Sequence, residues 1–389
     1  MTGRESNTRV RPRCVPVGVP SASNNRPDDP SLEAIAAQAL QSLGEGSGMD
    51  RRGFMRGMAL ASALAGIALA GCMPQNEPAE QQVQRIIPTP APRLRAAFSH
   101  NGLQGSWNAR GRDTSQFLGR LLGIDVVNYD GEFNVDKQRR DLIEIASQQW
   151  DFVAIHPAAV NAYLEPVQEL IRRGIPVIDM DTRLADDLLG LGVVTFLEPD
   201  NLWMGEQVTQ AIIDAVQSQN QSFEIIHTQG QLTHTGAQGR ARGFHKVIER
   251  YPGIKVLDET PGDWDADKTS KLWDTLLERY PNVRAGFCHN DDMALAALRS
   301  VKKAGKQEQV IIGGIDGMQP ACAAVERGDL VATAINPTGR IHGGAIWIGY
   351  FLATRGKLES VPKFIRMDGG IINRENAAGY YWLGDHLLI

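Results

Sequence analysis

Residues 285–300, AGFCHNDDMALAALRS, place four polar side chains between two apolar segments. The apolar run 285–288 has the length of a buried strand, whereas the second run, 293–298, falls within a predicted helix of residues 291–304. The polar residues 289–292 therefore lie where a strand ends and a helix begins. Such a group suits a catalytic cluster, a metal site or a site for a polar ligand.

The same unit, a short apolar strand followed by a helix, recurs from about residue 94 onward. The predicted strands are 94–100, 124–130, 151–157, 175–181, 191–200, 222–230, 253–259, 283–290, 309–316 and 330–337. The predicted helices are 109–122, 135–148, 159–173, 201–217, 237–250, 266–279, 291–304, 319–327 and 339–354. Such alternation indicates parallel sheets covered by helices on both faces. Because these strands are too many for one open sheet, we predict an α/β fold with two doubly wound parallel-sheet lobes.

A single eight-fold barrel is the alternative to two lobes. Barrel enzymes build their active sites from elaborated loops that follow the strands. The connections GIDGMQP (314–320) and AINPTGR (334–340) are short and turn-like. The doubly wound arrangement is therefore favoured.

Composition excludes several classes of protein. The chain has 389 residues, of which 42% are apolar and 22% charged, and its formal net charge is −5. Proteins that bind nucleic acids usually present a basic face, and a net charge of −5 gives no reason to expect one. The chain has only one long apolar run, so it is not a bundle of membrane-spanning helices. Cys288 and Cys322 are predicted to be small core residues, with a disulfide between them left open.

The long apolar run belongs to residues 49–72, MDRRGFMRGMALASALAGIALAGC. Positive residues, then apolar residues, then small residues are the layout of an export signal. The pair Arg51 and Arg52 resembles a twin-arginine signal, and LAGC at 69–72 resembles a lipobox, whose Cys72 becomes the lipid-bearing first residue of the mature protein. We therefore predict a periplasmic or extracytoplasmic protein that meets a cell membrane only through lipid at Cys72.

Two further segments lie outside the predicted lobes. Residues 1–48 are rich in Arg, Ser, Pro and Asn and are predicted to be a disordered N-terminal extension, with Met49 as an alternative start. Residues 73–92 are dense in Pro, Gln and Glu and are predicted to be a flexible linker.

Polar residues end many of the predicted strands, and ligands of open parallel sheets bind beyond the carboxyl ends of the strands. These strand-end residues are His100, Asn101, His156, Asp181, His227, His289, Asn290, Asp316 and Asn336. Arg110 and Arg240 add forked donors, and Trp107 and Trp264 add flat apolar faces. Carboxylates and guanidinium groups form charge-assisted bonds with vicinal hydroxyls. The set predicts a site for a monosaccharide or polyol in a cleft between two lobes. A phosphate ligand is less favoured, because the sequence has no Walker loop.

From residue 93 to about 372 the chain resembles the periplasmic sugar-binding proteins of the ribose-binding type, which feed ATP-driven importers. The segments that carry the resemblance are GIPVIDMDT (174–182), PDNLWMGEQ (199–207), HTGAQGRARGF (234–244), DWDADK (263–268), HNDDMALAALRSVKKAG (289–305), GGIDGM (313–318) and VATAINP (331–337). The resemblance implies these ligand contacts: Asp181, Arg240, Trp264, Asn290, Asp316 and Asn336. Trp107 and Asn101 of the first loop are added to them as candidates.

The resemblance also implies how the protein works. Two lobes joined by a hinge would close on the ligand without catalysis, cofactor or metal. The partners would be the permease and ATPase subunits of an ABC importer. One lobe would comprise residues 93–199 with 338–368 and the other 200–337 with 369–389, and the chain would cross between them near 199, 337 and 369.

Two departures from the ribose binders argue against ribose as the ligand. Those proteins carry an Arg directly after the first Asp, where this chain has Thr182. The first loop, residues 99–111, is longer than theirs and has one Trp in place of a pair of Phe. We therefore expect a different sugar or polyol.

The polar residues at 290–292 have a structural interpretation as well. Asn290 and Asp291 both favour helix N-caps, so we expect one of them to cap the helix while its neighbour reaches the cleft. Asp292 is expected to be a first-turn acid that the helix dipole favours.

A metal interpretation rests on His100, His156, His227 and His289, which all end strands and could converge. Because no HExxH or other closely spaced pair appears, a site without metal is favoured.

Three other functions remain beside transport. An enzyme such as a glycosidase could use Asp181 and Asp316 as an acid/base pair, although no G-x-S-x-G elbow occurs. A sugar-sensing repressor needs a DNA-reading domain ahead of residue 93, where the export signal is predicted instead. Presentation of a sugar to a chemoreceptor stays open as an alternative.

Overall fold

The computed structural model of the chain describes residues 94–217 and 222–384. The predicted extension 1–48, the export signal 49–72 with Cys72, and the linker 73–92 lie outside these residues. In the part of the chain that is described, no helix combines the length and the apolar composition needed to cross a bilayer.

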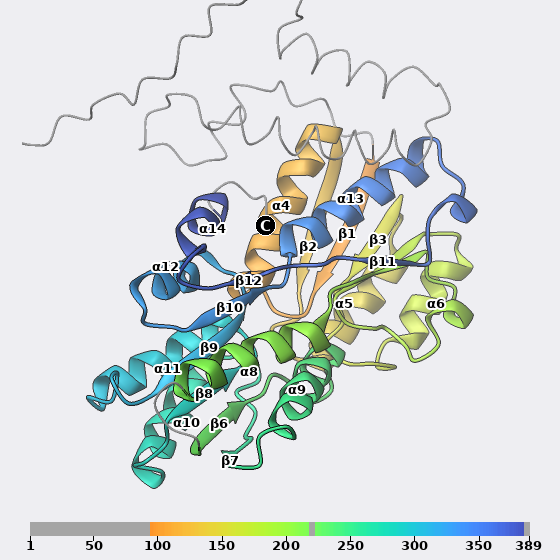
Figure 1. The fold of residues 1–389 in the computed structure, drawn as a ribbon. Helices are drawn as coiled ribbons and strands as arrows, with labels where there is room; N and C mark the ends of the chain where they lie inside the picture. The colour runs from red at the N-terminus through yellow and green to blue at the C-terminus, as the bar shows by residue number, and fades with distance from the viewer. Residues whose placement is uncertain (1–93, 218–221, 385–389) are drawn as a thin grey trace, which may run out of the picture. The chain divides into compact units, whose positions relative to one another are not determined.

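The strands form two separate six-stranded sheets (Figure 1). The first has the order β11-β5-β4-β3-β1-β2, and the second has the order β12-β10-β9-β8-β6-β7. The strands of the first sheet are β1 (Leu94–His100), β2 (Ile124–Asp130), β3 (Phe152–Ile155), β4 (Val177–Met180), β5 (Thr195–Glu198) and β11 (Phe364–Arg366). Those of the second are β6 (Phe223–Thr228), β7 (Ile254–Asp258), β8 (Ala285–Cys288), β9 (Ile311–Asp316), β10 (Ala332–Ile335) and β12 (Ile371–Ile372).

Neighbouring strands pair in parallel in both sheets, except that β10 and β12 are antiparallel. The helices are α4 (Ser106–Leu122), α5 (Val135–Ser147), α6 (Leu164–Arg172), α7 (Leu188–Leu191), α8 (Asn201–Gln217), α9 (Thr235–Ile248), α10 (Ala266–Arg279), α11 (Asp291–Lys303), α12 (Gln319–Arg327), α13 (Thr338–Thr354) and α14 (Ala377–Gly384), with a 3-10 turn at Leu358–Ser360. Two open, parallel-stranded α/β sheets confirm the predicted fold class, and they exclude the barrel.

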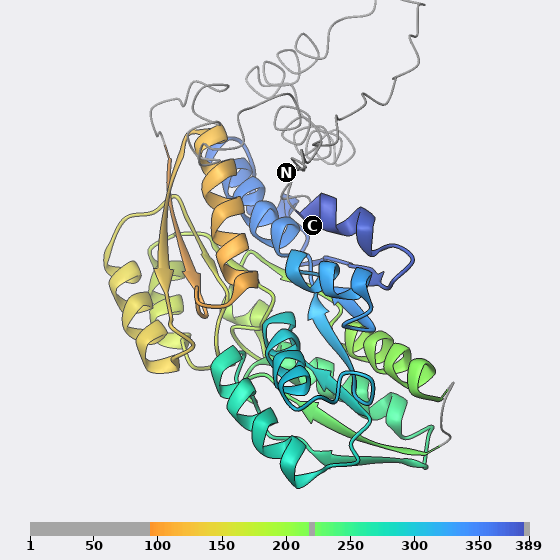
Figure 2. The same cartoon turned by 90° about the vertical axis from the view of Figure 1, so that its left-hand side faces the viewer.

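Helices cover each sheet in two layers. In the first sheet α4 packs along α13, as Figure 2 shows, while α5 and α6 contact each other on β1, β2 and β4. In the second sheet α8 packs along α9, and α10, α11 and α12 form the other layer. The central strand β3, Phe152–Ile155, is buried along its whole length. Such a strand reads as a continuous apolar run rather than an alternation, which is why the sequence pattern revealed it.

The chain passes between the sheets at three places. It leaves the first sheet after β5, returns to it through α13 after β10, and leaves it again between β11 and β12. Each sheet is thus built from two stretches of chain that lie far apart in the sequence. The residues directly after β5, directly after β10 and directly before β12 therefore connect the two lobes.

Some predicted elements differ in their bounds. The helix predicted at 159–173 begins only at Leu164, because Asn161 has a φ of 60° that no α-helix accepts. The strand predicted at 191–200 shortens to Thr195–Glu198, because Gly192 adopts a left-handed conformation after α7. Cys288 and Cys322 are both buried, and both are free thiols.

Candidate ligand-binding pocket

A pocket of about 350 Å³, counting the open space at its mouth, lies where the carboxyl ends of the two sheets face each other. The residues that line it are Asn101, Gly105, Trp107, Asn108, Phe133, His156, Asp181, His234, Arg240, Trp264, Asn290, Asp316 and Asn336. Every residue predicted for the ligand site is among them. Their role as ligand contacts remains a prediction.

Asp181 follows β4 and presents its carboxylate to the first-lobe side of the pocket. Its side chain is 3% exposed, and its Oδ1 accepts a 2.8 Å hydrogen bond from Nδ2 of Asn336. Burial alone would raise the pKa of this carboxyl, but its contact with His156 and its electrostatic interactions with His156, His234 and Arg240 lower the pKa overall. The group is therefore an ionised acceptor, as a hydroxyl-bearing ligand requires.

Arg240 on α9 and Asp316 at the end of β9 form the second-lobe counterpart. Nη2 of Arg240 lies 3.4 Å from Oδ1 of Asp316, and both side chains are about one-twentieth exposed or less. The guanidinium also donates through Nε to Oδ1 of Asn201 at 2.9 Å and through Nη1 to the carbonyl of His289. Burial raises the pKa of Asp316 well above its usual value, although Arg240 opposes that rise. Arg240 is thus fixed by three partners before any ligand arrives.

Asn290 carries both of the roles that were expected to be divided between it and its neighbour. Its Oδ1 accepts from the backbone N–H of Met293 at 2.9 Å, so it caps α11, and it also lines the pocket. Asp291 does not reach the pocket, which corrects the expectation. It is fully buried, and its carboxylate accepts from the Met318 N–H and the Thr333 hydroxyl.

The two indoles differ in how they are held. Nε1 of Trp107 donates to the backbone carbonyl of Asn336 at 2.9 Å, which ties the first loop to the end of β10. The Trp264 ring lies 5.5 Å from the guanidinium carbon of Arg240, and its indole approaches Gly230 so closely that a Cβ there would lie 2.1 Å from it. Gly230 therefore leaves the space that the Trp264 ring fills.

Several lining residues hold conformations that L-amino acids rarely adopt. Their φ angles are 53° for Phe133, 60° for Asp181, 68° for Trp264 and 130° for Asp316. Each such residue costs of the order of 1–3 kcal/mol. Strain of this kind gathers where side chains must be aimed at a ligand, and here four of the lining residues show it.

The chain is similar over most of its length to known proteins. Residues 97–358 match the periplasmic binding protein domain. The chain belongs to the periplasmic binding protein family. It is 25% identical over 268 residues to the D-allose-binding periplasmic protein of Escherichia coli, covering 67% of this chain and 85% of that protein. It is 30% identical over 222 residues to the ribose import binding protein of Haemophilus influenzae, covering 57% and 73%.

A solved structure is similar as well. The periplasmic binding protein of the arabinose ABC transporter from Shewanella sp. ANA-3, bound to L-arabinofuranose, superposes with a TM-score of 0.67 at 25% identity, covering 75% of this chain and 95% of that one. The recognised family resemblance to sugar-binding proteins of the ribose type is therefore confirmed. Members of this family are binding proteins rather than enzymes.

In this periplasmic binding protein the two lobes meet directly beside the pocket. Nδ2 of Asn101 donates to Oε1 of Gln231 at 3.3 Å, and Nε2 of Gln231 donates to the carbonyl of Phe133 at 2.8 Å. The backbone N–H of Ser106 donates to Oδ2 of Asp292 at 2.8 Å. Asp292, expected only as a first-turn acid, thus also joins the lobes. These bonds join the two lobes beside the pocket.

The lining residues that the sequence did not single out are Gly105, Asn108, Phe133 and His234, together with His156, which was noted only as a strand end. His156 follows β3, so the strand-end rule could have included it. His234 precedes α9 and enters the pocket from the other lobe. Its signal was its place at the head of HTGAQGRARGF (234–244), a segment already used for Arg240.

The four strand-end histidines of this periplasmic binding protein do not converge on one point. His156 lies in the pocket, whereas His100 bonds Oδ1 of Asn128 through Nε2 at 2.7 Å. His227 and His289 pair behind the pocket, with their Nε2 atoms 2.7 Å apart. The arrangement that motivated the metal interpretation is therefore absent for these four residues.

The buried pair His227 and His289 has defined tautomers. Nδ1 of His289 accepts from the Gly230 N–H at 3.0 Å, so its Nε2 carries the proton and donates to Nε2 of His227. His227 then donates from Nδ1 to Oε1 of Glu259 at 2.8 Å. Burial lowers the pKa of both histidines, which keeps them neutral. This chain of bonds supports the wall of the pocket at Gly230, against which Trp264 lies.

Proposed function

We propose that this chain is an extracytoplasmic solute-binding protein that captures a monosaccharide or polyol between its two lobes and delivers it to an ABC importer. The relatives reported above are named for D-allose and ribose, and the similar structure holds L-arabinofuranose. All three are small aldoses with several hydroxyl groups. The ligand of this protein has the same size and chemistry.

One observation carries the proposal. Among the described residues, buried pocket atoms without a hydrogen-bond partner are Oδ1 of Asn101, Nε1 of Trp264 and Oδ1 of Asn336. An unsatisfied buried polar atom costs about 1–3 kcal/mol. Two acceptors and one donor, placed beside an ionised carboxylate and two indoles, match a guest whose hydroxyls both donate and accept.

The ligand we propose is a sugar or polyol other than ribose. Thr182 stands where ribose binders carry an Arg, and its hydroxyl lies 3.2 Å from Oδ2 of Asp181 and 2.5 Å from Nε2 of His234. The Thr182 hydroxyl thus contacts other residues of the pocket wall, and it cannot offer the ligand the paired N–H donors of an Arg side chain.

We further propose that the protein binds its ligand without turning it over. The pKa of Asp181 lies below its usual value and that of Asp316 above it, a division that glycosidases use. Asp316, however, already pairs with the guanidinium of Arg240. The family to which the chain belongs also consists of binding proteins. Recovery of the bound sugar in chemically unchanged form is the expected outcome.

The location is part of the same proposal. Residues 49–72 would direct export to the periplasm, and lipid on Cys72 would hold the protein at a membrane. Cys72→Ser should release the protein into the soluble periplasmic fraction. Replacing Arg51 and Arg52 together by Lys should leave it in the cytoplasm.

A ligand screen tests the function. The purified protein is heated with single monosaccharides, polyols, amino acids and nucleosides, and a true ligand raises the melting temperature progressively with its concentration over Kd. We expect a hit among the carbohydrates, a Kd near the micromolar range, about 8 kcal/mol, and recovery of the unchanged ligand by NMR. Stabilisation by amino acids with none from carbohydrates would contradict the proposal, as would conversion of the sugar.

A further inference from the structure

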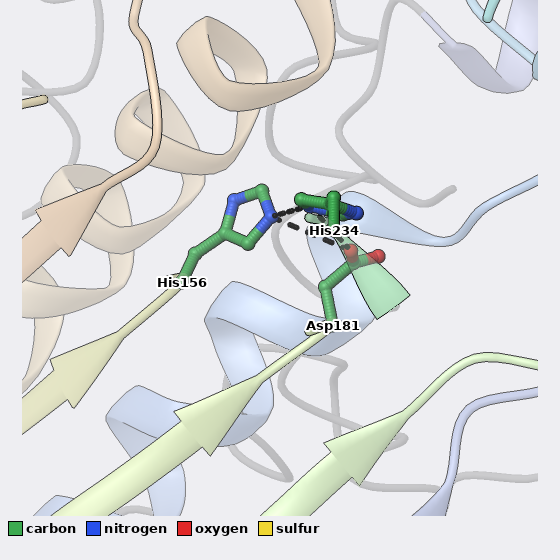
Figure 3. A group of neighbouring side chains, drawn as sticks. All are labelled: His156, Asp181 and His234. Atoms are coloured by element: carbon green, nitrogen blue, oxygen red, sulfur yellow. Dashed lines mark hydrogen bonds and ion pairs between the residues drawn. The ribbon is translucent and has the colours of Figure 1, made fainter. Parts of the chain in front are cut away.

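Three side chains of the pocket direct ligand atoms toward one another (Figure 3). Nε2 of His156 lies 3.0 Å from Nε2 of His234 and 3.4 Å from Oδ2 of Asp181. Nε2 of His234 lies 3.7 Å from the same oxygen. Three ligands held 2.0–2.1 Å from one tetrahedral zinc ion are about 3.4 Å apart. The triangle therefore already has the dimensions of three corners of a coordination shell.

Outer partners orient two of the three corners. Nδ1 of His156 lies 2.8 Å from Oδ1 of Asn108, an oxygen that can only accept, so Nδ1 carries the proton and Nε2 presents a lone pair to the centre. Oδ1 of Asp181 accepts from Asn336, which leaves Oδ2 for the centre. The Thr182 hydroxyl lies 3.1 Å from Nδ1 of His234 and 2.5 Å from its Nε2, so it would have to turn away from Nε2 for an ion to bind there. Metal-binding histidines and carboxylates are held by such outer bonds.

Burial and charge suit a cation as well. The side chains of His156, Asp181 and His234 are each 5% exposed or less. Asp181 supplies one formal negative charge, and imidazole nitrogens and carboxylate oxygens are among the ligands that zinc takes in proteins.

We propose that His156, Asp181 and His234 bind one divalent ion of the zinc type, with an open coordination position that faces the pocket. His156 and Asp181 belong to the first lobe and His234 to the second, so the ion would clamp the lobes together. Two histidines and a carboxylate with an open fourth position form an established set of zinc ligands. The proposal rests on the proposed function only in its last step, in which a hydroxyl of the sugar or polyol fills the open position.

A second group, His227, His245 and Glu259, makes a weaker candidate and a good control. Both histidines contact the same carboxylate oxygen, Oε1 of Glu259, at 2.8 and 2.9 Å. The side chains of His245 and Glu259 are 45% and 39% exposed, so water solvates them. Within the part of the chain that the structure describes, no outer hydrogen-bond partner holds His245 in the way that Asn108 holds His156.

The test begins with metal alone. The purified protein is stripped with a chelator and titrated with Co²⁺, whose visible bands report tetrahedral coordination, and then with Zn²⁺ as a competitor. We expect one ion per chain. His234→Gln and Asp181→Asn should each weaken binding by about 100-fold or more, and Asn108→Ala should weaken it by about 10–100-fold, as outer partners do. His245→Ala is the matched control and should leave the titration unchanged.

Two results overturn the clamp: absence of stoichiometric Co²⁺ binding, or loss of binding in His245→Ala with retention in His234→Gln. The circular dichroism of every variant is recorded, so that an unfolded variant is recognised and replaced by Asn108→Ala as the decisive one. The sugar screen is repeated with chelator and with Zn²⁺. If sugar binding is the same with and without chelator and no Co²⁺ bands appear, the metal site is contradicted and the proposed function stands. If Co²⁺ bands appear but no carbohydrate stabilises the protein, the metal site stands and the proposed function is contradicted.

Discussion

Nδ2 of Asn336 donates a 2.8 Å hydrogen bond to Oδ1 of Asp181, joining residues 155 positions apart. Asn336 follows β10 of the second sheet, and Asp181 follows β4 of the first. Oδ1 of the same Asn336 side chain has no partner among the described residues. One amide therefore both links the lobes and offers an acceptor to the ligand.

Replacing Asn336 by Ala should weaken ligand binding by about 10–100-fold, because a hydrogen bond to a charged group contributes about 1.5–3 kcal/mol. Isothermal titration with the sugar found in the screen measures the change. Asn134→Ala is the control, since the exposed side chain of Asn134 caps α5, accepts from the Lys137 N–H and does not line the pocket. That variant should lose about 1 kcal/mol of folding stability and keep its affinity. Equal affinities for both variants would rule out this role of Asn336.

Asp292→Ala should favour the open arrangement of the lobes, because Oδ2 of Asp292 accepts from the Ser106 N–H of the other lobe. Asp292 does not line the pocket, so we expect a modest loss of affinity, about threefold to tenfold, from one hydrogen bond of about 0.5–1.5 kcal/mol. Small-angle scattering of the ligand-free variant should give a larger radius of gyration than the wild type. Asp267→Ala changes the equivalent second residue of α10, which is exposed. If Asp267→Ala changed the affinity and the radius of gyration to the same extent, the effect would come from losing an acid in the first turn of a helix and not from the bond between the lobes.

Trp264→Phe tests the indole N–H, which has no partner among the described residues. The variant keeps an aromatic face but removes the donor, so affinity should fall by roughly tenfold, the effect of one lost bond of about 1.5 kcal/mol. Trp273→Phe is the matched control: its indole is buried in the core and donates to the Thr228 hydroxyl at 2.9 Å. Trp273→Phe should lower stability and leave affinity intact. The reverse pattern would remove Trp264 from the binding site.

The sequence predicted those pocket residues that lie directly after a strand. Asp181, Asp316 and Asn336 end strands of parallel sheets, and parallel strands bring their carboxyl ends to one edge. His234 was missed because it ends no strand: it precedes α9 of the second lobe, and only the folded structure brings it 3.0 Å from His156 of the first. Phe133 was missed because its φ of 53° is unusual for an aromatic residue, and nothing in its local sequence demands it.

Contacts within a single motif were equally hard to apportion. The sequence HNDD at 289–292 predicted a cap, a pocket residue and a first-turn acid. The structure gives the cap and the pocket contact to Asn290 together, and it buries Asp291 against Met318 and Thr333. Thr333 lies 42 positions away from Asp291. Adjacent carboxylates of one helix start are distinguished only by partners that the fold brings from elsewhere.

Acid should destabilise the protein through its buried histidines, and His100 gives the clearest case. Burial lowers its pKa from 6.5 to about 4 in the folded state, whereas the unfolded chain keeps the higher value. Between these values the unfolded state binds more protons, so stability is fully present above about pH 6.5 and falls as the pH drops toward 4. One such group contributes at most about 1.4 kcal/mol per pH unit.

His100→Gln removes this titration, so the free energy of unfolding should depend less steeply on pH between 6.5 and 4 than in the wild type. Urea denaturation at pH 7.5, 5.5 and 4.5 measures both slopes. The variant loses the 2.7 Å contact of His100 with Asn128, so its stability at pH 7.5 should also be lower. If the unfolding free energy of His100→Gln depends on pH as steeply as that of the wild type, the loss of stability in acid comes from other groups. His100 would then bind the same number of protons in the folded and the unfolded state.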